Sequence, residues 1–262
     1  MTMIAVAALA LFAVPANAKT FSAQQGSVSA TITYTKTATT HLTISRNGAT
    51  LFDGVPSLQE CSDACAPSGF TDDPPLRVLD LDGNGEPEVV YSAYSGGAHC
   101  CSIAQVYRLN AAANGYDTSE HDFGDPGFAL KDLDGDGRPE WMTGDDAFAY
   151  RFTAYAFSAL PVQVLRFGAD GFSDVTNSFP GTINSDLDRW WKRYRRVRGH
   201  RDGTELGPVS AWAADMYRLG KRAHVLKVLR SEARHGRLRG PGHTQGARYV
   251  KVLDKFLRKS GY

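Results

Sequence analysis

Hydrophobic and polar residues alternate along the first part of the chain. The segments S-V-S-A-T-I-T-Y-T-K (27–36), H-L-T-I-S (41–45) and A-T-L-F (49–52) place Val, Ile, Leu, Thr and Tyr at a period of two. This period, with β-branched and aromatic residues, is typical of half-buried β-strands. Asn47-Gly48, between the last two segments, is a strong hairpin signal. The opening region therefore predicts antiparallel strands joined by tight turns.

The strand pattern continues in two similar segments, each centred on an acidic stretch. One stretch reads D-L-D-G-N-G-E-P-E over residues 80–88, and the other reads D-L-D-G-D-G-R-P-E over residues 132–140. Their spacing of 52 residues is close to the period of a four-stranded propeller blade. With the N-terminal hairpins, this makes about three four-stranded antiparallel β units. Because a closed propeller needs at least four blades, we expect a propeller-like open array with its exposed edges covered by another part of the chain.

The hydrophobic period changes from two to 3.6 at Ser185. We expect Ser185 to cap a first helix, Pro208 to start a second, residues 221–235 to form a third, and Thr244 to cap a fourth. Single-glycine turns between helices favour packed αα-hairpins. The sequence thus predicts an α+β protein with a β-repeat domain over residues 19–184 and a C-terminal helical domain over residues 185–262.

The two acidic stretches resemble the calcium loops of FG-GAP/VCBS-type repeats. Such repeats form integrin-like β-propellers and occur in many exported bacterial proteins. The later segment G-F-S-D-V-T (171–176) is similar to the blade-closing strand of these repeats, so the resemblance covers about residues 76–176. It implies calcium binding within a β-repeat fold. Because the family spans adhesion modules and enzyme appendages, the resemblance does not assign an activity.

Each acidic stretch supplies oxygen ligands at a spacing that suits calcium. Side-chain oxygens fall at positions one, three and five, a backbone carbonyl at position seven and a glutamate at position nine, with glycine at position six. Position twelve is Tyr91 or Thr143, where an EF-hand has glutamate, so these loops are not EF-hands. The alternative is a pair of solvated Asp/Gly turns. The predicted ligands are Asp80, Asp82, Asn84, Glu86 and Glu88 in the first loop, and Asp132, Asp134, Asp136, Arg138 and Glu140 in the second.

We expect the calcium to be structural, because the loops leave no evident open coordination position for a substrate. The second loop has Asp136 where the first has the neutral Asn84. Since ligand charge tunes affinity, the second loop is expected to bind calcium more tightly. Glu86 is expected to contribute only its backbone carbonyl, with its side chain pointing away from the ion.

The first 18 residues have the pattern of a secretory signal peptide. An apolar run ends in the small-x-small sequence Ala16-Asn17-Ala18, which predicts cleavage after Ala18. A membrane anchor is the alternative, but the run is shorter than the ~20 residues that span a bilayer. We therefore expect a protein that is secreted, or that is periplasmic or otherwise located at the cell envelope.

Four cysteines fit such an oxidising location. Because disulfides persist there, Cys61, Cys65, Cys100 and Cys101 are expected to form structural disulfides that join the 61/65 loop to the 100/101 strand. A metal site that includes His99 is the alternative.

Charge is divided unevenly between the two predicted domains. Residues 1–184 hold nine Lys/Arg and 21 Asp/Glu, whereas residues 185–262 hold 20 Lys/Arg and seven Asp/Glu. The basic helical segment therefore suits an anionic envelope glycan or lipid, with peripheral membrane contact, or an unidentified protein partner. The alternative is that its charges only solvate the helices or face the acidic β region. No nucleic-acid-binding motif is present, and no such partner is expected.

Enzyme motifs are scarce in the sequence. It contains no G-x-S-x-G, no H-E-x-x-H and no P-loop. Single histidines such as His41 and His121 are typical of packed or surface residues. The aromatic residues between 148 and 157 favour the core of a strand or turn region, with sugar stacking as the alternative. Asp145-Asp146 are expected to end a loop or to add a metal ligand.

These patterns favour a binding or scaffold module without assigned catalytic or cofactor-binding residues. The alternative is a cell-envelope hydrolase that acts on glycans and uses Asp145 or Asp146 as an acid.

Overall fold

The computed structural model describes residues 18–35, 38–59, 61, 65–68, 73–96, 101–240 and 244–262. Apart from Ala18, the expected signal peptide lies outside these residues, and so do His99 and Cys100. Within the described ranges, no helix is both long and apolar enough to cross a membrane.

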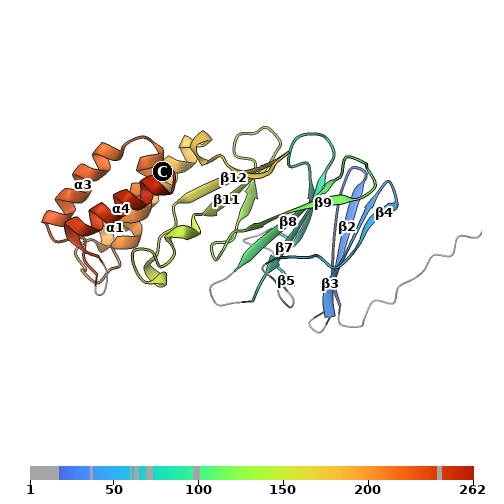
Figure 1. Ribbon diagram of the computed structural model, residues 1–262, viewed down its shortest axis with the longest axis horizontal. Helices are drawn as coiled ribbons and strands as arrows, with labels where there is room; N and C mark the ends of the chain where they lie inside the picture. The colour runs from blue at the N-terminus through green and yellow to red at the C-terminus, as the bar shows by residue number, and fades with distance from the viewer. Residues whose placement is uncertain are drawn as a thin grey trace, which may run out of the picture.

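The β part of the chain forms three antiparallel sheets, and the strands of each follow one another in chain order (Figure 1). The first sheet contains β1 (Lys19–Gln25), β2 (Val28–Thr35), β3 (Ala38–Arg46) and β4 (Ala49–Gly54). The middle sheet contains β6 (Leu76–Leu79), β7 (Glu88–Tyr94), β8 (Ser102–Leu109) and β9 (Tyr116–Asp122), and the short β5 (Ala66–Pro67) also pairs with β7. The third contains β10 (Ala129–Lys131), β11 (Glu140–Gly144), β12 (Val162–Gly168) and β13 (Gly171–Asp174). The expected α+β class is confirmed.

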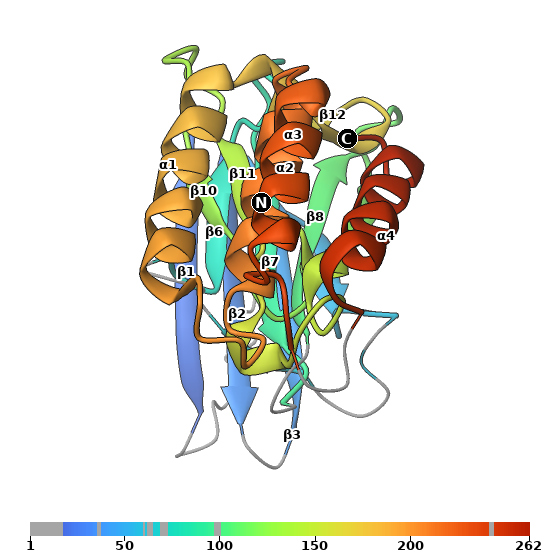
Figure 2. The ribbon, with the colours of Figure 1, turned by 90° about the vertical axis from the view of Figure 1, so that its left-hand side faces the viewer.

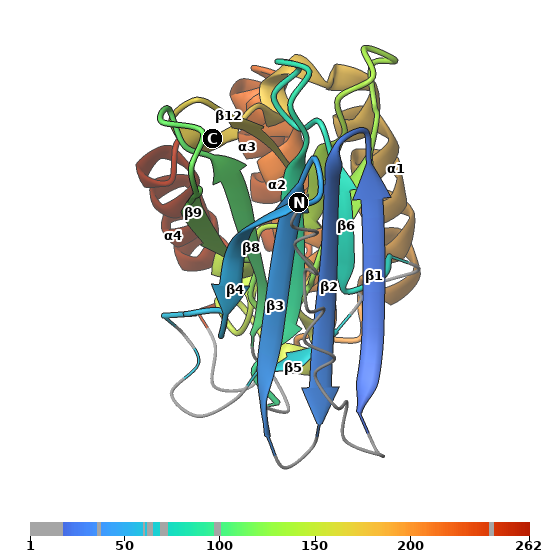
Figure 3. The same cartoon turned by 90° about the vertical axis from the view of Figure 1, so that its right-hand side faces the viewer.

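The sheets stack face to face. One core lies between the first and middle sheets and includes Ile44 and Tyr91. A second core lies between the middle and third sheets and includes Val90 and Trp141. Val90 and Tyr91 are neighbours on β7, and they enter different cores because successive side chains of a strand point to opposite faces. The middle sheet is therefore buried on both faces, whereas the first sheet turns its outer face to solvent (Figure 3).

Four helices form the end of the molecule opposite the first sheet (Figure 2). They are α1 (Pro180–Val197), α2 (Leu206–Arg218), α3 (Arg222–Arg234) and α4 (Gly246–Lys259). The expectation that Ser185 caps the first helix is wrong. Pro180 begins the helix instead, because its missing N–H breaks no hydrogen bond in the first turn. Likewise, Gln245 rather than Thr244 precedes α4.

Helix α2 is the centre of the helical part and is buried along almost its whole length. Its core partners include Tyr194 of α1, Leu229 of α3 and Tyr249 of α4. At the beginning of α2, Gly207 lets the helix backbone lie against the backbone of Phe157, since an added Cβ would lie 1.9 Å from the Phe157 carbonyl oxygen. The helices therefore pack around α2 as a separate core, and α1 also packs on β12.

The aromatic series between residues 148 and 157 lies in turns and fastens the helices to the β part. Phe148 belongs to the short helical turn η1 (Asp146–Phe148), and a second turn, η2 (Tyr155–Phe157), follows. Phe148 and Phe152 enter the helical core and contact Phe256. Tyr150 and Phe157, in contrast, are 59% and 40% exposed. The expected packing role is confirmed for part of the series, in a turn region rather than a strand.

Candidate metal sites

Both acidic stretches are hairpin loops of the same construction. The first joins β6 to β7, and the second joins β10 to β11. The pairs that close the loops are Leu79 with Glu88 and Lys131 with Glu140, so eight residues lie within each loop. The glutamate at position nine is therefore the first residue of the returning strand in both.

Glycines give the two loops the same backbone path. At position four, Gly83 and Gly135 have φ angles of +77° and +78°, and at position six Gly85 and Gly137 have +85° and +87°. A side chain is strained at such angles, so glycine allows the backbone to turn around one centre. The glycine expected from the loop spacing is at position six, but position four has the same conformational requirement.

Backbone N–H groups orient the acidic side chains identically in the two loops. Asp80 accepts hydrogen bonds from the N–H groups at positions four and six, at 2.8 and 3.0 Å, and Glu88 accepts one from position two at 2.8 Å. Asp132 and Glu140 repeat this arrangement at 2.7, 3.0 and 2.9 Å. The side chains at positions three and five each accept from the N–H two residues ahead. The loops are thus structural copies in their backbone and in the hydrogen bonds of the side chains at positions one, three, five and nine.

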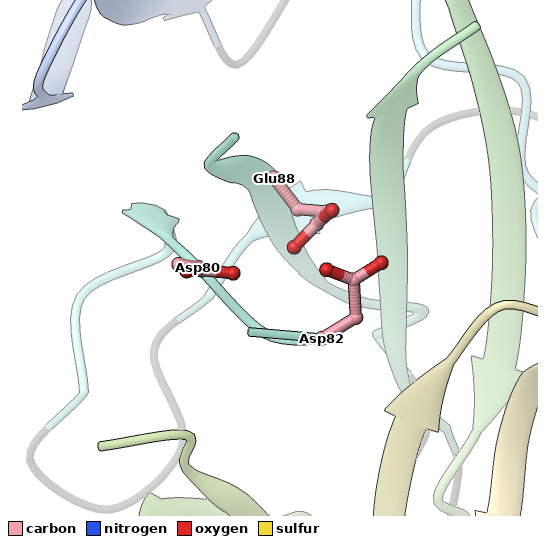
Figure 4. Close-up of side chains that lie close together, drawn as sticks. All are labelled: Asp80, Asp82 and Glu88. Carbon is pink, nitrogen blue, oxygen red and sulfur yellow. The ribbon is translucent and has the colours of Figure 1, made fainter. Parts of the chain in front are cut away.

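Three carboxylates converge in each loop. One oxygen from each of Asp80, Asp82 and Glu88 lies within 4.8 Å of the others, and the three side chains face one another in Figure 4. The corresponding group in the second loop is Asp132, Asp134 and Asp136. Several hard oxygen donors at this separation fit a divalent cation such as calcium, magnesium or manganese. Both sets of carboxylates are therefore compatible with a bound divalent cation. The glutamate of the second loop, Glu140, does not belong to the second group.

An arginine that sequence analysis did not anticipate lies beside the first group. Arg108 of β8 approaches Asp82 to 3.2 Å and Glu88 to 3.7 Å. It also donates to the carbonyl of Ala169 at 2.9 Å and lies over the ring of Phe167 in the third sheet. Arg108 therefore connects the first acidic loop to the next sheet.

Arg166 of β12 has the equivalent position beside the second loop. It contacts Asp134 at 2.8 Å, and its Nε donates to Glu140 Oε1 at 2.9 Å. Tyr107 pairs with Val89, and Leu165 pairs with Trp141. Each arginine is the next residue along its strand, so it lies opposite the glutamate at position nine of the loop. The equivalence of the two arginines is visible in the sequence, because they occupy the same place in the similar segments Q-V-Y-R-L (105–109) and Q-V-L-R-F (163–167).

Position seven differs between the loops. Glu86 turns its side chain to Arg46 of β3, which donates two hydrogen bonds of 2.7 and 2.8 Å to the carboxylate. Arg138 instead turns back to Asp136, and their contact lowers the pKa of that carboxyl. In the first loop, the acid at position seven therefore pairs with an arginine outside the loop. In the second loop, the arginine at position seven pairs with an aspartate of the loop's own carboxylate group.

Arg46 has the same place in the first sheet as Arg108 and Arg166 have in the other two sheets. It stands opposite Val28 in the pairing of β2 with β3, as the other two arginines stand opposite glutamates. A short Gly26-Ser27 turn occupies the place of the acidic loop. The first sheet is thus a copy of the unit that lacks the loop, and its arginine contacts Glu86 of the next unit.

Burial affects the acid at the centre of the first group. Glu88 is 1% exposed, and its burial raises its pKa to about 7, with the negative charges of Asp82 and Asp80 adding to the effect. The Leu81 N–H and Arg108 oppose this shift. A nearby cation favours the charged form of such a carboxyl.

The other singled-out residues have structural contacts. Asp145 caps η1 through its side chain and also accepts a hydrogen bond of 2.6 Å from the Tyr262 hydroxyl. Asp146 has a raised pKa, caused mainly by burial and by neighbouring Asp125. His121 packs on aromatic rings, and the imidazole of His41 bonds a surface carboxylate. These contacts agree with the expected loop end and packed or surface histidines.

The cysteines are linked differently from the expectation. Cys61 forms a disulfide with Cys65, so the 61/65 loop is closed on itself and is not joined to the 100/101 strand. The two residues are only four apart in sequence, and this short span brings them together locally. Cys101 is also disulfide-bonded. Disulfides of this kind are typical of an oxidising compartment.

A further acidic pair lies between α1 and α2. Asp186 accepts hydrogen bonds from the Val162 N–H at 2.8 Å and from the Trp190 indole at 2.9 Å. Asp215 is fully buried beside it, and within the described residues no donor meets either oxygen of its carboxylate form. Burial, followed by the charge of Asp186, raises the pKa of Asp215 to about 9. A protonated Asp215 satisfies this geometry by donating a hydrogen bond to Asp186.

Comparison with known proteins finds two partial relatives. The chain is 31% identical over 158 residues to an uncharacterized protein, y4bJ, of Sinorhizobium fredii, which covers 59% of this chain and 24% of the relative. It is 40% identical over 93 residues to a probable thylakoid lumen protein, sll0997, of Synechocystis, which covers 34% of this chain and 27% of that relative. The chain thus spans about a quarter of the length of these relatives. No protein-family model matches the chain, and no solved structure matches it significantly.

Proposed function

We propose that the protein is an exported, calcium-binding β-repeat module of the FG-GAP/VCBS type. The observation that carries this proposal is the duplicated convergence of three carboxylates on a left-handed glycine backbone. The first group is formed by Asp80, Asp82 and Glu88, which supply only the hard oxygen donors that calcium prefers. Bound calcium would neutralise these acids and hold the hairpin loops in position. The role is structural rather than catalytic.

The arrangement of the sheets supports a propeller-like open array. Each unit is built on four antiparallel strands, to which the middle unit adds the short β5, and the units stack by their faces as blades do. The helices cover the face of the third sheet that would otherwise be exposed. Such an array offers the turns and the outer face of the first sheet as recognition surfaces.

A location outside the cytoplasm is supported by separate observations. The N-terminal 18 residues have signal-peptide character, and the Cys61–Cys65 disulfide suits an oxidising compartment. One partial relative is described as a probable thylakoid lumen protein. We infer secretion or residence at the cell envelope, where the protein acts as a scaffold or binding module.

The basic helices supply the second half of the proposed function. They hold most of the chain's Lys and Arg residues, and many of these side chains are exposed. An anionic glycan or lipid of the envelope is the partner that this charge favours. The β array would then present its recognition surfaces while the helices hold the protein to the envelope.

Calcium titration of the mature protein tests the proposal. Calorimetry should show two sites in the wild type and none in the double variant Asp80→Asn/Asp132→Asn, and a chelator should lower the Tm of the wild type only. The double variant Asp117→Asn/Asp170→Asn, which removes two exposed acids outside the loops, is the matched control. No calcium binding and no response to chelator would refute the metal assignment. Turnover of an envelope glycan, lost in Asp146→Asn, would favour a hydrolase instead.

A further inference from the structure

A groove of about 450 Å³ runs between α3 and α4, on the end of the molecule that faces the viewer in Figure 2. Its volume lies within the range of small-molecule sites. It lies on the helices, at the opposite end of the molecule from the first sheet. The groove is therefore separate from the metal sites.

The charge of the groove is strongly unbalanced. Four cationic side chains line it, but only one acid does: the lining cations are Arg222, Arg230, Arg234 and Lys251. The acid, Asp254, accepts hydrogen bonds of 2.8 and 3.1 Å from Arg222. Among the described residues, no ion pair involves the other three cations. Three positive charges thus remain available to an anion in a groove with little competing acid.

The groove is also lined by apolar side chains. Leu226 and Ala233 come from α3, and Ala247 and Val250 come from α4. Together they make the apolar part of the groove, beside the cations of α3 and Lys251 of α4. A free inorganic anion would leave this surface exposed to water, and a glycan would find no aromatic ring among the lining residues on which to stack. An acyl chain, in contrast, would cover the apolar surface.

We propose that the α3–α4 groove binds an anionic lipid, with the phosphate near Arg230 and Lys251 and an acyl chain along the apolar residues. This inference rests on the proposed role of the basic helices at the envelope and names the lipid as the partner. It also assigns the contact to one groove rather than to the whole basic surface.

The test compares soluble single-chain lipids with the intact mature protein. Lysophosphatidylglycerol with a twelve-carbon chain supplies both chain and net charge, lysophosphatidylcholine of the same length removes the net charge, and glycerol 3-phosphate removes the chain. Calorimetry below the micellar concentration should show one site, with the anionic lipid bound at least tenfold more tightly than either comparison compound. Equal binding of the two lysolipids would overturn the role of charge.

Two variants and a control locate the site. Arg230→Gln/Lys251→Gln should weaken binding about 30-fold, since each cation contributes roughly 1 kcal/mol to anionic lipid binding and 1.4 kcal/mol is a factor of ten. Ala247→Trp should fill the groove and abolish lipid binding while the protein keeps its wild-type Tm. The control Arg195→Gln/Lys255→Gln removes the same charge from exposed helix positions outside the groove, and binding should change less than twofold.

Vesicle flotation separates failure of this inference from failure of the proposed function. If anionic vesicles bind the wild type and the groove and control variants weaken that binding equally, the basic surface stands and the groove is rejected. If the wild type binds neither anionic vesicles nor the lysolipid, the lipid partner and the groove are both rejected. Binding of a soluble acidic peptide that is lost in Arg230→Gln/Lys251→Gln, with no binding of lipid, would overturn the lipid assignment and give the groove to a protein partner.

Discussion

Arg166 on β12 lies opposite Glu140 on β11 and donates a hydrogen bond of 2.9 Å from Nε to its carboxylate. Glu140 is fully buried, whereas the arginine is 26% exposed at the edge of the acidic loop. A cationic side chain is therefore built into the fold beside each group of carboxylates, since Arg108 has the same place near Glu88. The arginine offsets part of the loop's negative charge, as a bound cation would.

Removal of Arg166 should destabilise the protein most when no metal is present. Loss of one partner from a buried pair typically costs about 3–5 kcal/mol, and partial exposure of the arginine reduces this to about 2–3 kcal/mol for Arg166→Gln. Urea unfolding in chelator measures the loss, which should shrink in calcium because a cation bound by the neighbouring aspartates would offset part of the local negative charge. The control Arg138→Gln breaks a more exposed pair and should cost much less than Arg166→Gln. Equal losses in the two variants would contradict the role of burial.

The arginines also change the expected order of calcium affinity. Sequence charge alone favours the second loop, which has one more carboxylate among the predicted side-chain ligands, since Glu86 is expected to give only its backbone carbonyl. Arg138 and Arg166 offset that difference, whereas among the described residues the ion pairs of the first group involve Arg108 alone. The glutamate at position nine belongs to the first carboxylate group, as Glu88, whereas Glu140 does not belong to the second.

We therefore predict that the first loop binds calcium more tightly. Asp80→Asn should remove more of the calcium-dependent rise in Tm than Asp132→Asn, because a ligand stabilises the folded state in proportion to the logarithm of its affinity. Melting curves across a calcium series measure both. A larger loss in Asp132→Asn would restore the order given by charge alone.

Asp215 should make stability fall as pH rises. The unfolded chain releases this proton near pH 3.8 and the folded protein near pH 9, so the folded state binds more protons between these values. Stability from this group is present at low pH and is lost as pH rises toward 9. Asp215→Asn should therefore raise Tm by several degrees at pH 8, corresponding to about 2 kcal/mol, and by much less near pH 4.

The exposed Asp188→Asn on α1 is the control for the Asp215 measurement, because it removes one acid of the helical part without burial. Its Tm should follow the wild type across the pH range. If Asp215→Asn raises Tm by the same amount at pH 4 and at pH 8, the raised pKa of Asp215 does not explain the gain in stability. The charges of Asp186, Arg189 and Arg218 also act on Asp215, so the curve should broaden rather than follow a single ideal titration.

The Cys61–Cys65 disulfide should contribute modestly to stability. It spans a sequence separation of four residues, and loop-closure entropy for so short a loop is about 2 kcal/mol, which is less than a link between distant strands would provide. Cys61→Ala/Cys65→Ala should lower the free energy of unfolding by about this amount in guanidinium titrations. A loss well above 4 kcal/mol would indicate that the disulfide also supports the neighbouring core.

Several features followed from the sequence because they depend on neighbouring residues. Period-two alternation located the strands, and Asn47-Gly48 located a hairpin. The repeated D-L-D-G stretches identified two equivalent loops, since ligand spacing and glycine placement are local properties of the chain. The 3.6-residue period found all four helices, but missed the start of α1 because Ser185 satisfied the local capping preference.

Tertiary structure decided which distant groups meet. Alternation does not show which face of β7 contacts which sheet, and only stacking buries Val90 and Tyr91 in different cores. Strand register brings Arg166 to Glu140, although 26 residues separate them. Packing of α1 on α2 likewise placed Asp215 beside Asp186, and burial then raised its pKa. Sequence alone therefore determined the repeats and candidate ligands, whereas the charge balance around them arose from long-range pairing and desolvation.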